Sequence, residues 1–291
     1  MEDLMMNMKK FGALLLAAAM TLSLAACGSS SSSGSSAPAA SASGSAAGSS
    51  AAASEPAETM IYAVEAGSAG EAAAQENGFE YNSVASQADA LMEVAAGTSD
   101  AAIIDLLMAV AMTGEDTSYP NLTYGDGLTT EEYGVGCRKG SDLAYYINDV
   151  FSEAYADGSM QAVAETYKLQ DAMVEQPDAA GFTPTEDGDV AYIQDKGTLV
   201  VGITDFEPMD YKDANGEWIG FDADMAKIVA EKLGVECQFI EIDWDNKIME
   251  LDSKNIDVVW NGMTLTNEVM GAMDCTNPYF NNAQVVVTAA K

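Results

Sequence analysis

The sequence predicts an α/β fold with mostly parallel sheets, because strand-like and helix-like segments alternate along the chain. Two blocks show this alternation, one from about residue 60 to 176 and the other from about 189 to 291. Residues 177–188 between them are polar and contain two prolines, which is typical of a linker. A chain of 291 residues that is 48% apolar is long enough for two lobes with buried cores.

The first block combines short apolar runs with amphipathic stretches. The runs predict strands at 61–64, 100–105 and 133–138, and the stretches predict helices at 71–77, 87–96, 142–156 and 160–167. Gly97 follows the second of these helices and is expected to end it.

The second block repeats the pattern. Strands are predicted at 198–203, 237–242, 256–260 and 284–287. A helix is predicted at 222–233, with Asp222 as its N-terminal cap and Gly234 at its end. Ligands of such folds bind at the loops beyond the carboxyl ends of the strands, so binding residues are expected there.

The charge balance excludes several classes of function. The chain has 46 acidic and 12 basic residues, no histidine and a formal net charge of −34. Without histidine, a His-dependent catalytic triad and a His-ligated metal site are impossible. Nucleic acids and anionic lipids repel so acidic a chain, so no nucleic-acid partner is expected. Arg138 is the only arginine, which limits bidentate recognition of a carboxylate to one position.

Residues 1–27 are typical of a secretory signal and resemble that of a bacterial lipoprotein. A lysine pair precedes an apolar run that is too short to span a membrane, and the run ends in Leu-Ala-Ala-Cys. Cys27 is therefore the predicted lipidation site, which makes the membrane a partner through a lipid anchor. The alternative is an ordinary secretory signal with a chance cysteine. Residues 28–58 are almost entirely Ser, Ala and Gly and predict a disordered tether.

Three further cysteines, Cys137, Cys237 and Cys275, cannot all pair within one chain. No Cys-x-x-Cys motif occurs, so a zinc site or a thioredoxin-like site lacks support. We interpret the three as small buried apolar side chains, and we expect neither a metal nor a cofactor.

Several motifs in consistent spacing resemble those of one bacterial family. The second block contributes LVVGITDFEPMD at the start of 199–236, IDVVWNGMTLT at 256–266 and NPYF at 277–280. The first block contributes VEAGSAGE at 64–71, GTSDAAIID at 97–105 and EYGVGCRKGSDL at 132–143. Together they resemble the bacterial extracellular solute-binding proteins of family 3, the substrate-binding lipoproteins of polar amino-acid ABC transporters. The resemblance implies a two-lobed, periplasmic-binding-protein-like (type II) fold with a hinge.

The order of the blocks is exchanged relative to that family, so the chain resembles a circular permutation. The expected organisation is lobe 2 at 59–130, a hinge strand and helices returning to lobe 1 at 131–176, the linker at 177–188, and the lobe 1 core with a C-terminal hinge strand at 189–291. Only the strand near 133–138 is then expected to connect the lobes covalently. The C-terminal strand would be a free end that could exchange with a second copy. The alternative is a rearranged gene product that folds poorly.

In the second block the resemblance implies ligand contacts at two strand ends. Phe206, beside Asp205, holds the place of an aromatic residue that packs on the ligand, and a core position is the alternative. Trp260 either stacks on the ligand or fills the core. The residues that follow it supply backbone and side-chain polar groups for a ligand carboxylate or amide: Asn261, Gly262 and Thr264.

In the first block the implied contacts lie at the ends of two other strands. Gly67, Ser68 and Ala69 precede a helix whose N-terminal amides suit a carboxylate, although a plain strand-to-helix turn is the alternative. Asp105 ends a buried strand and matches the acid that pairs with a ligand ammonium group. A helix cap is its alternative role.

One departure from the family concerns the carboxylate. The arginine that clamps it in the family falls at Val269 here, and no other arginine replaces it. For Arg138 we expect a role in a surface or C-terminal ion pair. Either backbone amides hold the carboxylate, or the ligand is not a standard α-amino acid.

The resemblance implies a lipid-anchored receptor of an ABC importer on the extracytoplasmic face of the bacterial cell membrane. It would capture a small polar, amine-bearing solute, an amino acid or a derivative, between two closing lobes and then dock on the permease. An extracytoplasmic sensor on the same fold is an alternative. A dehydratase-like enzyme is a weaker one, because nothing pairs its available acids, Glu65, Asp205, Glu207 and Asp210. No enzymatic activity is expected.

Overall fold

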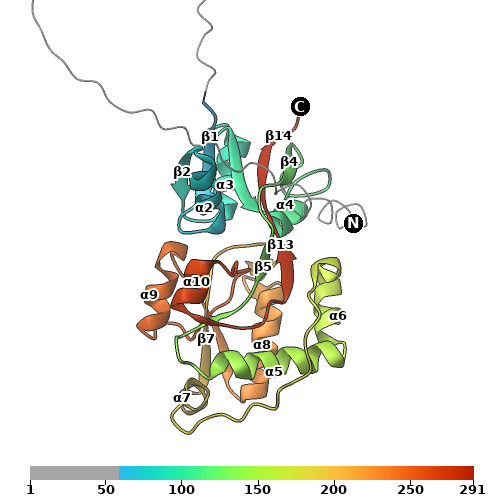
Figure 1. Ribbon diagram of the computed structural model, residues 1–291. Coiled ribbons are helices and arrows are strands. Elements are labelled where there is room, and N and C mark those ends of the chain that lie inside the picture. The colour runs from blue at the N-terminus through green and yellow to red at the C-terminus, as the bar shows by residue number, and fades with distance from the viewer. Residues whose placement is uncertain (1–58) are drawn as a thin grey trace, which may run out of the picture. The chain divides into compact units, whose positions relative to one another are not determined.

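The computed structural model describes residues 59–291, which form one compact unit (Figure 1). The predicted signal peptide, the lipidation site Cys27 and the tether at 28–58 lie outside the described residues. Within the described part, no helix is both long and apolar enough to cross a membrane. Two lobes, each built on a sheet, make up the unit (Figure 1).

Lobe 2 consists of residues 60–128 and the C-terminal strand. Its sheet has the order β2-β1-β3-β14-β4. The strands are β1 (Ile61–Glu65), β2 (Glu80–Val84), β3 (Ala101–Asp105), β4 (Leu122–Gly127) and β14 (Gln284–Ala289), and the helices are α2 (Ala69–Asn77), α3 (Gln87–Ala96) and α4 (Leu106–Met112).

Both faces of this sheet are covered. Val64 and Ile103 pack against Ala73 and Ala74 of α2. Side chains of a strand alternate between the two faces, so their neighbours, such as Ile104, point to the other face, and they are fully buried as well. Only the edges of the sheet and the ends of its strands are therefore exposed to solvent, and a binding site can form there.

Lobe 1 consists of residues 134–279, and its sheet has the order β10-β7-β11-β6-β12. The strands are β6 (Gly136–Cys137), β7 (Thr198–Ile203), β10 (Glu236–Glu241), β11 (Val258–Val259) and β12 (Asp274–Cys275), with β8 (Tyr211–Lys212) and β9 (Trp218–Ile219) as a separate hairpin. The helices are α5 (Leu143–Ala156), α6 (Ser159–Thr166), η2 (Gln170–Ala172), α7 (Asp189–Lys196), α8 (Phe221–Leu233), η3 (Trp244–Asn246), α9 (Lys247–Asp252) and α10 (Asn267–Ala272).

Two chain segments connect the lobes, where we expected one. β5 (Glu131–Tyr133) leads from lobe 2 to lobe 1, and β13 (Phe280–Asn282) returns antiparallel beside it (Figure 1). β14 continues from β13 and inserts between β3 and β4, so the C-terminal strand is paired on both sides within its own chain. The expectation of a single covalent connection is wrong because the last strand completes the sheet of lobe 2.

The α/β fold class is confirmed, but the sheets are mixed rather than mostly parallel. β1 pairs in parallel with β2 and β3, and β7 pairs in parallel with β10 and β11. The antiparallel pairs belong to β14 and β6, the first strands that each lobe receives after the chain has crossed the hinge. The pattern of apolar residues within a strand does not indicate whether the strand pairs parallel or antiparallel with its neighbours.

Most predicted helices and strands are confirmed, and the misses have local causes. β2 was missed because its side chains are largely exposed and show no apolar run. α7 was missed because it is short and mainly polar. The expected strand at 133–138 is interrupted, and only its two ends form β5 and β6.

Asp222 is not the cap of its helix, which is a second correction. Gly220, with a φ of 120°, precedes α8, and the fully buried Asp222 lies within the helix. Its Oδ2 accepts hydrogen bonds from the Gly262 amide at 2.6 Å and from the Tyr279 hydroxyl at 2.8 Å. The carboxylate therefore joins α8 to the loop after β11 and to the segment that enters the hinge.

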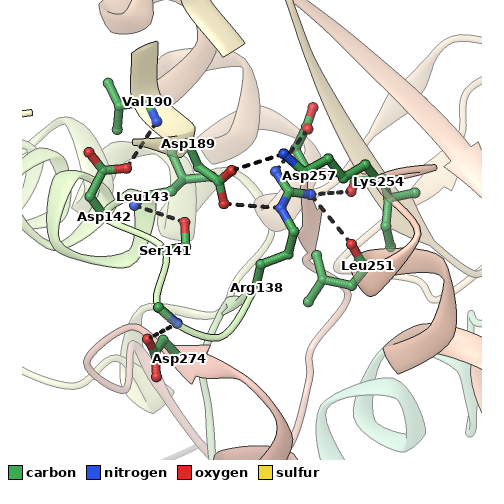
Figure 2. Close-up of polar contacts among 12 residues, drawn as sticks. Arg138, Ser141, Asp142, Leu143, Asp189, Val190, Leu251, Lys254, Asp257 and Asp274 are labelled. Atoms are coloured by element: carbon green, nitrogen blue, oxygen red, sulfur yellow. Dashed lines mark hydrogen bonds and ion pairs between the residues drawn. The ribbon is translucent and has the colours of Figure 1, made fainter. Parts of the chain in front are cut away.

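Arg138 lies inside lobe 1 rather than on its surface (Figure 2). Its guanidinium donates to Asp189 at 3.0 Å, to Asp257 at 3.3 Å and to the Ile256 carbonyl at 2.8 Å. Asp257 is fully buried and also accepts from Lys196. Arg138 thus ties the end of β6 to α7 and β11, and it is committed to the scaffold.

Candidate functional site

A cavity of about 290 Å³ lies between the two lobes. Its lining comes from the strand ends, from the turns that follow them and from short helices. Lobe 2 contributes Glu65, Gly67, Ser68, Ala69, Ala72, Glu76, Gln87 and Asp105, and lobe 1 contributes Trp244, Lys247, Ile248, Asn261, Gly262, Met263, Thr264, Thr266, Asn267, Glu268 and Val269.

The structure brings seven of the ten expected ligand contacts together at this cavity: Gly67, Ser68, Ala69, Asp105, Asn261, Gly262 and Thr264. The other three have different surroundings. Phe206 is buried with its ring edge-on to Tyr133, and Trp260 is buried edge-on to Phe151. Asp205 is exposed beyond β7. Ligand contact stays a prediction for all ten residues.

Asp105 is a buried residue of the cavity lining, and its carboxylate is already hydrogen-bonded within the chain. Its Oδ1 accepts from the Tyr133 hydroxyl at 2.7 Å, from Gln284 at 3.0 Å and from Asn282. Its Oδ2 accepts from Gln87, whose amide oxygen in turn accepts from the Asp105 backbone N–H at 2.8 Å. Asp105 precedes α4, but its side chain does not cap that helix.

Burial governs the ionisation of this carboxyl group. It raises the pKa of Asp105, and the nearby Glu131 carboxylate raises it further. Glu131 belongs to the hinge and accepts from Thr264 of lobe 1 and from Gln284 of lobe 2, each at 3.0 Å. One polar network therefore joins the hinge to the cavity lining.

The turn before α2 holds a carboxylate, but this carboxylate comes from the chain itself. Glu71 accepts from the Gly67 amide at 2.8 Å, and the Glu71 amide donates to the hydroxyl of Ser68, the N-terminal cap of α2, at 3.1 Å. Gly67 has a φ of 68°, and a Cβ there would lie 2.7 Å from the Cα of Asp245 in lobe 1. The turn is thus a point of close approach between the lobes.

In the loop after β11, polar groups are also hydrogen-bonded to other groups of the chain. Asn261 accepts from the Thr204 amide at 3.0 Å and donates to the Thr204 hydroxyl at 2.7 Å. Gly262 has a φ of 55°, and a Cβ there would lie 2.5 Å from the Phe206 ring. These contacts hold the loop against the core of lobe 1 and set the shape of the cavity wall.

Val269, where the resemblance led us to expect an arginine in the family, packs into the core of lobe 1 with Met263 and Met273. Among the described residues, Lys247 is the one basic side chain that lines the cavity. Sequence reasoning did not single it out, although the absence of an arginine was a reason to look for another cation.

Glu65 is also part of this wall, at the end of β1. It is only 2% exposed, and burial raises its pKa to about 8; the neighbouring Asp105 adds to the rise and Lys247 opposes it. Glu65 was considered only as a possible acid of an enzyme. The other acids of that alternative lie apart from it: Asp205 and Glu207 are outside the cavity lining, and Asp210 is buried in lobe 1.

Comparison with known proteins finds relatives for the second block. Residues 199–291 match the model of the bacterial extracellular solute-binding proteins, family 3. The L-cystine-binding protein TcyJ of Escherichia coli (strain K12) is 34% identical over 95 residues, 32% of this chain and 36% of that protein. The arginine-binding extracellular protein ArtP of Bacillus subtilis (strain 168) is 33% identical over 94 residues, again 32% and 36%.

A solved structure of arginine-bound, truncated ArgBP from T. maritima is 41% identical over 31% of this chain and 43% of that chain, with a TM-score of 0.30. The chain spans little more than a third of the length of the curated relatives that it matches.

Proposed function

Because residues 199–291 match the model of the bacterial extracellular solute-binding proteins, family 3, we propose that this protein binds a small polar, amine-bearing solute between its two lobes. The solute is an amino acid or a derivative of one. The curated relatives bind L-cystine and arginine according to their names, which supports this class of ligand without selecting a member of it.

The observation that carries the proposal is the cavity between the lobes. Its volume of about 290 Å³ is close to the lower end of the usual range for small-molecule sites. Polar groups from both lobes line it, including Ser68 and Asp105 on one side and Asn261 and Thr264 on the other. A solute in this position is enclosed by both lobes, so its binding favours the closed arrangement.

The family further supports a role in import. We propose that the closed protein delivers its solute to an ABC permease, and that a lipid on Cys27 holds it on the extracytoplasmic face of the cell membrane. Lipid attachment is testable by mass spectrometry of the membrane-bound protein and by Cys27→Ala, which is expected to release the protein from the membrane.

We also propose that the chain order is a circular permutation, and the geometry of lobe 2 supports it. β1 and β14 flank β3 on opposite sides, and Tyr62 near the start of β1 and Thr288 near the end of β14 both lie opposite Ala101. Two strand spacings, about 10 Å, therefore separate the two ends of the described unit. A short connector can join ends that close.

The test of the binding function is a thermal melt of the protein against a panel of amino acids and amines. A ligand at a hundred times its Kd stabilises the protein by about 2.7 kcal/mol, which shifts the Tm by several degrees. Ala72→Trp fills the cavity from the exposed side of α2, so we expect it to abolish the shift. Ala95→Trp, at an exposed position of α3 outside the cavity, is the matched control and should keep it. A shift that survives Ala72→Trp would place the ligand elsewhere.

A further inference from the structure

Lys247 is a buried cation at the start of α9. Its side chain is 7% exposed, and its ammonium group donates to the Trp244 carbonyl at 3.2 Å and, across the cleft, to the Gly67 carbonyl at 2.8 Å. It lies 4.9 Å from the centre of the Trp244 ring. An ammonium group has three N–H donors, so one remains. Within residues 59–291, no carboxylate oxygen lies within 4.0 Å of it.

Glu65, which lines the cavity from lobe 2, has a hydrogen-bond acceptor without a donor, whereas Lys247 has a donor without an acceptor. The Oε1 of Glu65 is buried and has no hydrogen-bond partner among the described residues, although Gln87 and Thr204 lie close enough to lower the pKa of this carboxyl group. Buried side-chain oxygens of folded proteins almost always accept a hydrogen bond, because leaving one unpaired costs free energy. A buried acceptor without a donor at a cavity therefore indicates a place for a donor from a ligand.

Asp105, in contrast, has no unpaired carboxylate oxygen. Four side chains already donate to its two oxygens: Gln87, Tyr133, Asn282 and Gln284. A carboxylate has about four lone-pair sites, so these donors account for them. Of the two buried acids that line the cavity, Glu65 is the one with an open acceptor.

We propose that Lys247 and Glu65 contact the two charged groups of a zwitterionic ligand, with Lys247 bound to its carboxylate and Glu65, which releases its proton to solvent on binding, bound to its ammonium group. The proposal rests on the proposed binding function and deepens it. Asp105 then acts as a positioning residue through Gln87 and the hinge. Lys247 supplies the positive charge that the family takes from an arginine, whose position Val269 occupies here.

The charges support this division of roles. Lys247 belongs to lobe 1 and Glu65 to lobe 2, so a ligand that spans them is held by both lobes. Their mutual attraction is felt at Glu65, whose pKa Lys247 lowers, yet the two groups form no ion pair with each other. An amino acid between them pairs both groups at once and removes the cost of two uncompensated buried groups.

The experiment measures the affinities of three compounds by calorimetry: the best-binding amino acid of the panel, the amine that lacks its carboxylate, and the acid that lacks its ammonium group. If L-arginine binds best, the amine is agmatine. Lys247→Met is expected to weaken the amino acid and the desamino acid by about tenfold to a hundredfold and to leave the amine nearly unchanged. Lys247→Arg keeps the charge and should retain much of the affinity for the amino acid.

Glu65→Gln is expected to show the converse pattern, weakening the amino acid and the amine but not the desamino acid. The matched controls are Lys212→Met, a half-exposed lysine of lobe 1 outside the cavity, and Glu80→Gln, an exposed acid of lobe 2 outside the cavity. Both should bind all three compounds as the original protein does. Ligand-free melts of each variant confirm that it is folded.

Two results would overturn the inference while leaving the binding function intact. Equal weakening of all three compounds by Lys247→Met would mean that Lys247 only joins the lobes through Gly67. Unchanged affinities in Lys247→Met or Glu65→Gln would exclude these side chains as ligand contacts. If the original protein binds none of the amino acids or amines, the proposed function itself is wrong.

Discussion

Glu65 and Asp105 are carboxyl groups that folding removes from water. Burial is the largest cause of the raised pKa of each, and each also lies near another acid. A group whose pKa is raised on folding holds its proton more tightly in the native state than in the unfolded chain. Native stability therefore falls as the pH rises through the interval between the two pKa values.

For Glu65 this interval runs from 4.5 to about 8. We expect the Tm of the ligand-free protein to fall as the pH rises across it, because each buried acid contributes up to about 1.4 kcal/mol per pH unit. Glu65→Gln removes one such group and should make the decline shallower, whereas Glu76→Gln, which removes an exposed acid, should not. Differential scanning calorimetry at several pH values measures the slope. An unchanged slope in Glu65→Gln would mean that this carboxyl titrates normally.

Gly262 tests the shape of the cavity wall. Gly262→Ala places a Cβ 2.5 Å from the Phe206 ring and 3.1 Å from the Tyr133 ring, so we expect the free energy of unfolding to fall by about 1–3 kcal/mol. Gly140→Ala is the control, since Gly140 also has a positive φ, 79°, but nothing lies within 4 Å of the added atom. Urea unfolding of the two variants separates steric overlap from backbone strain. Equal losses would show that crowding at Gly262 is absent.

At the scale of elements, the segment 177–188 has no helix or strand of its own but is bonded to α5. Asp149 accepts from the amides of Ala180 and Phe182, and the Phe182 ring stacks on Tyr145. Asp142 accepts from the amide of Val190 at 3.0 Å, which joins the start of α5 to the start of α7. The connection between the two blocks therefore follows the surface of lobe 1 closely.

Removing both acids should release this segment. We expect the double variant Asp142→Ala/Asp149→Ala to be cut within 177–188 by a low concentration of protease, several times faster than the original chain, because buried or bonded backbone resists cleavage. Asp157→Ala is the control, since Asp157 ends the same helix and bonds only to Ser159. Mass spectrometry of the fragments locates the cut. Equal rates of cleavage would indicate that the bonds to α5 do not restrain the segment.

At the scale of the whole molecule, the hinge is a pair of antiparallel segments that carry the chain in opposite directions. β13 delivers the last strand to lobe 2, where it lies between β3 and β4. The two ends of the described unit consequently belong to one lobe and lie on either side of a single strand, β3. Exchange of the C-terminal strand with a second copy would require breaking both of its pairings.

A variant with changed chain connectivity tests the proposed permutation. A short glycine-rich connector from residue 291 to residue 59, with new ends opened between 177 and 188, should fold and bind the same solute, because no pairing of the described unit is broken. Opening the same closed chain inside α5 is the control and should fail, since it cuts a buried helix. Circular dichroism, melting and calorimetry compare the chains. An unfolded product from the 177–188 opening would contradict the proposed permutation.

Sequence patterns predicted many of the local elements well. α3 and β7 have the bounds that periodicity indicated, because a helix stripe or an apolar run is encoded within its own residues. Strand-end turns were also located, which is why seven expected contacts line one cavity. Failures occurred where the local pattern is silent, as in the exposed β2 and the short polar α7.

The sequence by itself determined the class of fold, the two blocks and the presence of valine at position 269, whereas the exchanged order of the blocks stays a prediction. Only the tertiary structure decided that β14 completes lobe 2, that Asp105 is saturated, and that Lys247 and Glu65 face one cavity. Those facts depend on which donors and acceptors meet from segments more than a hundred residues apart, as Lys247 and Gly67 do. A local sequence pattern does not indicate such long-range contacts, because burial and hydrogen bonding between distant segments arise only when the lobes pack.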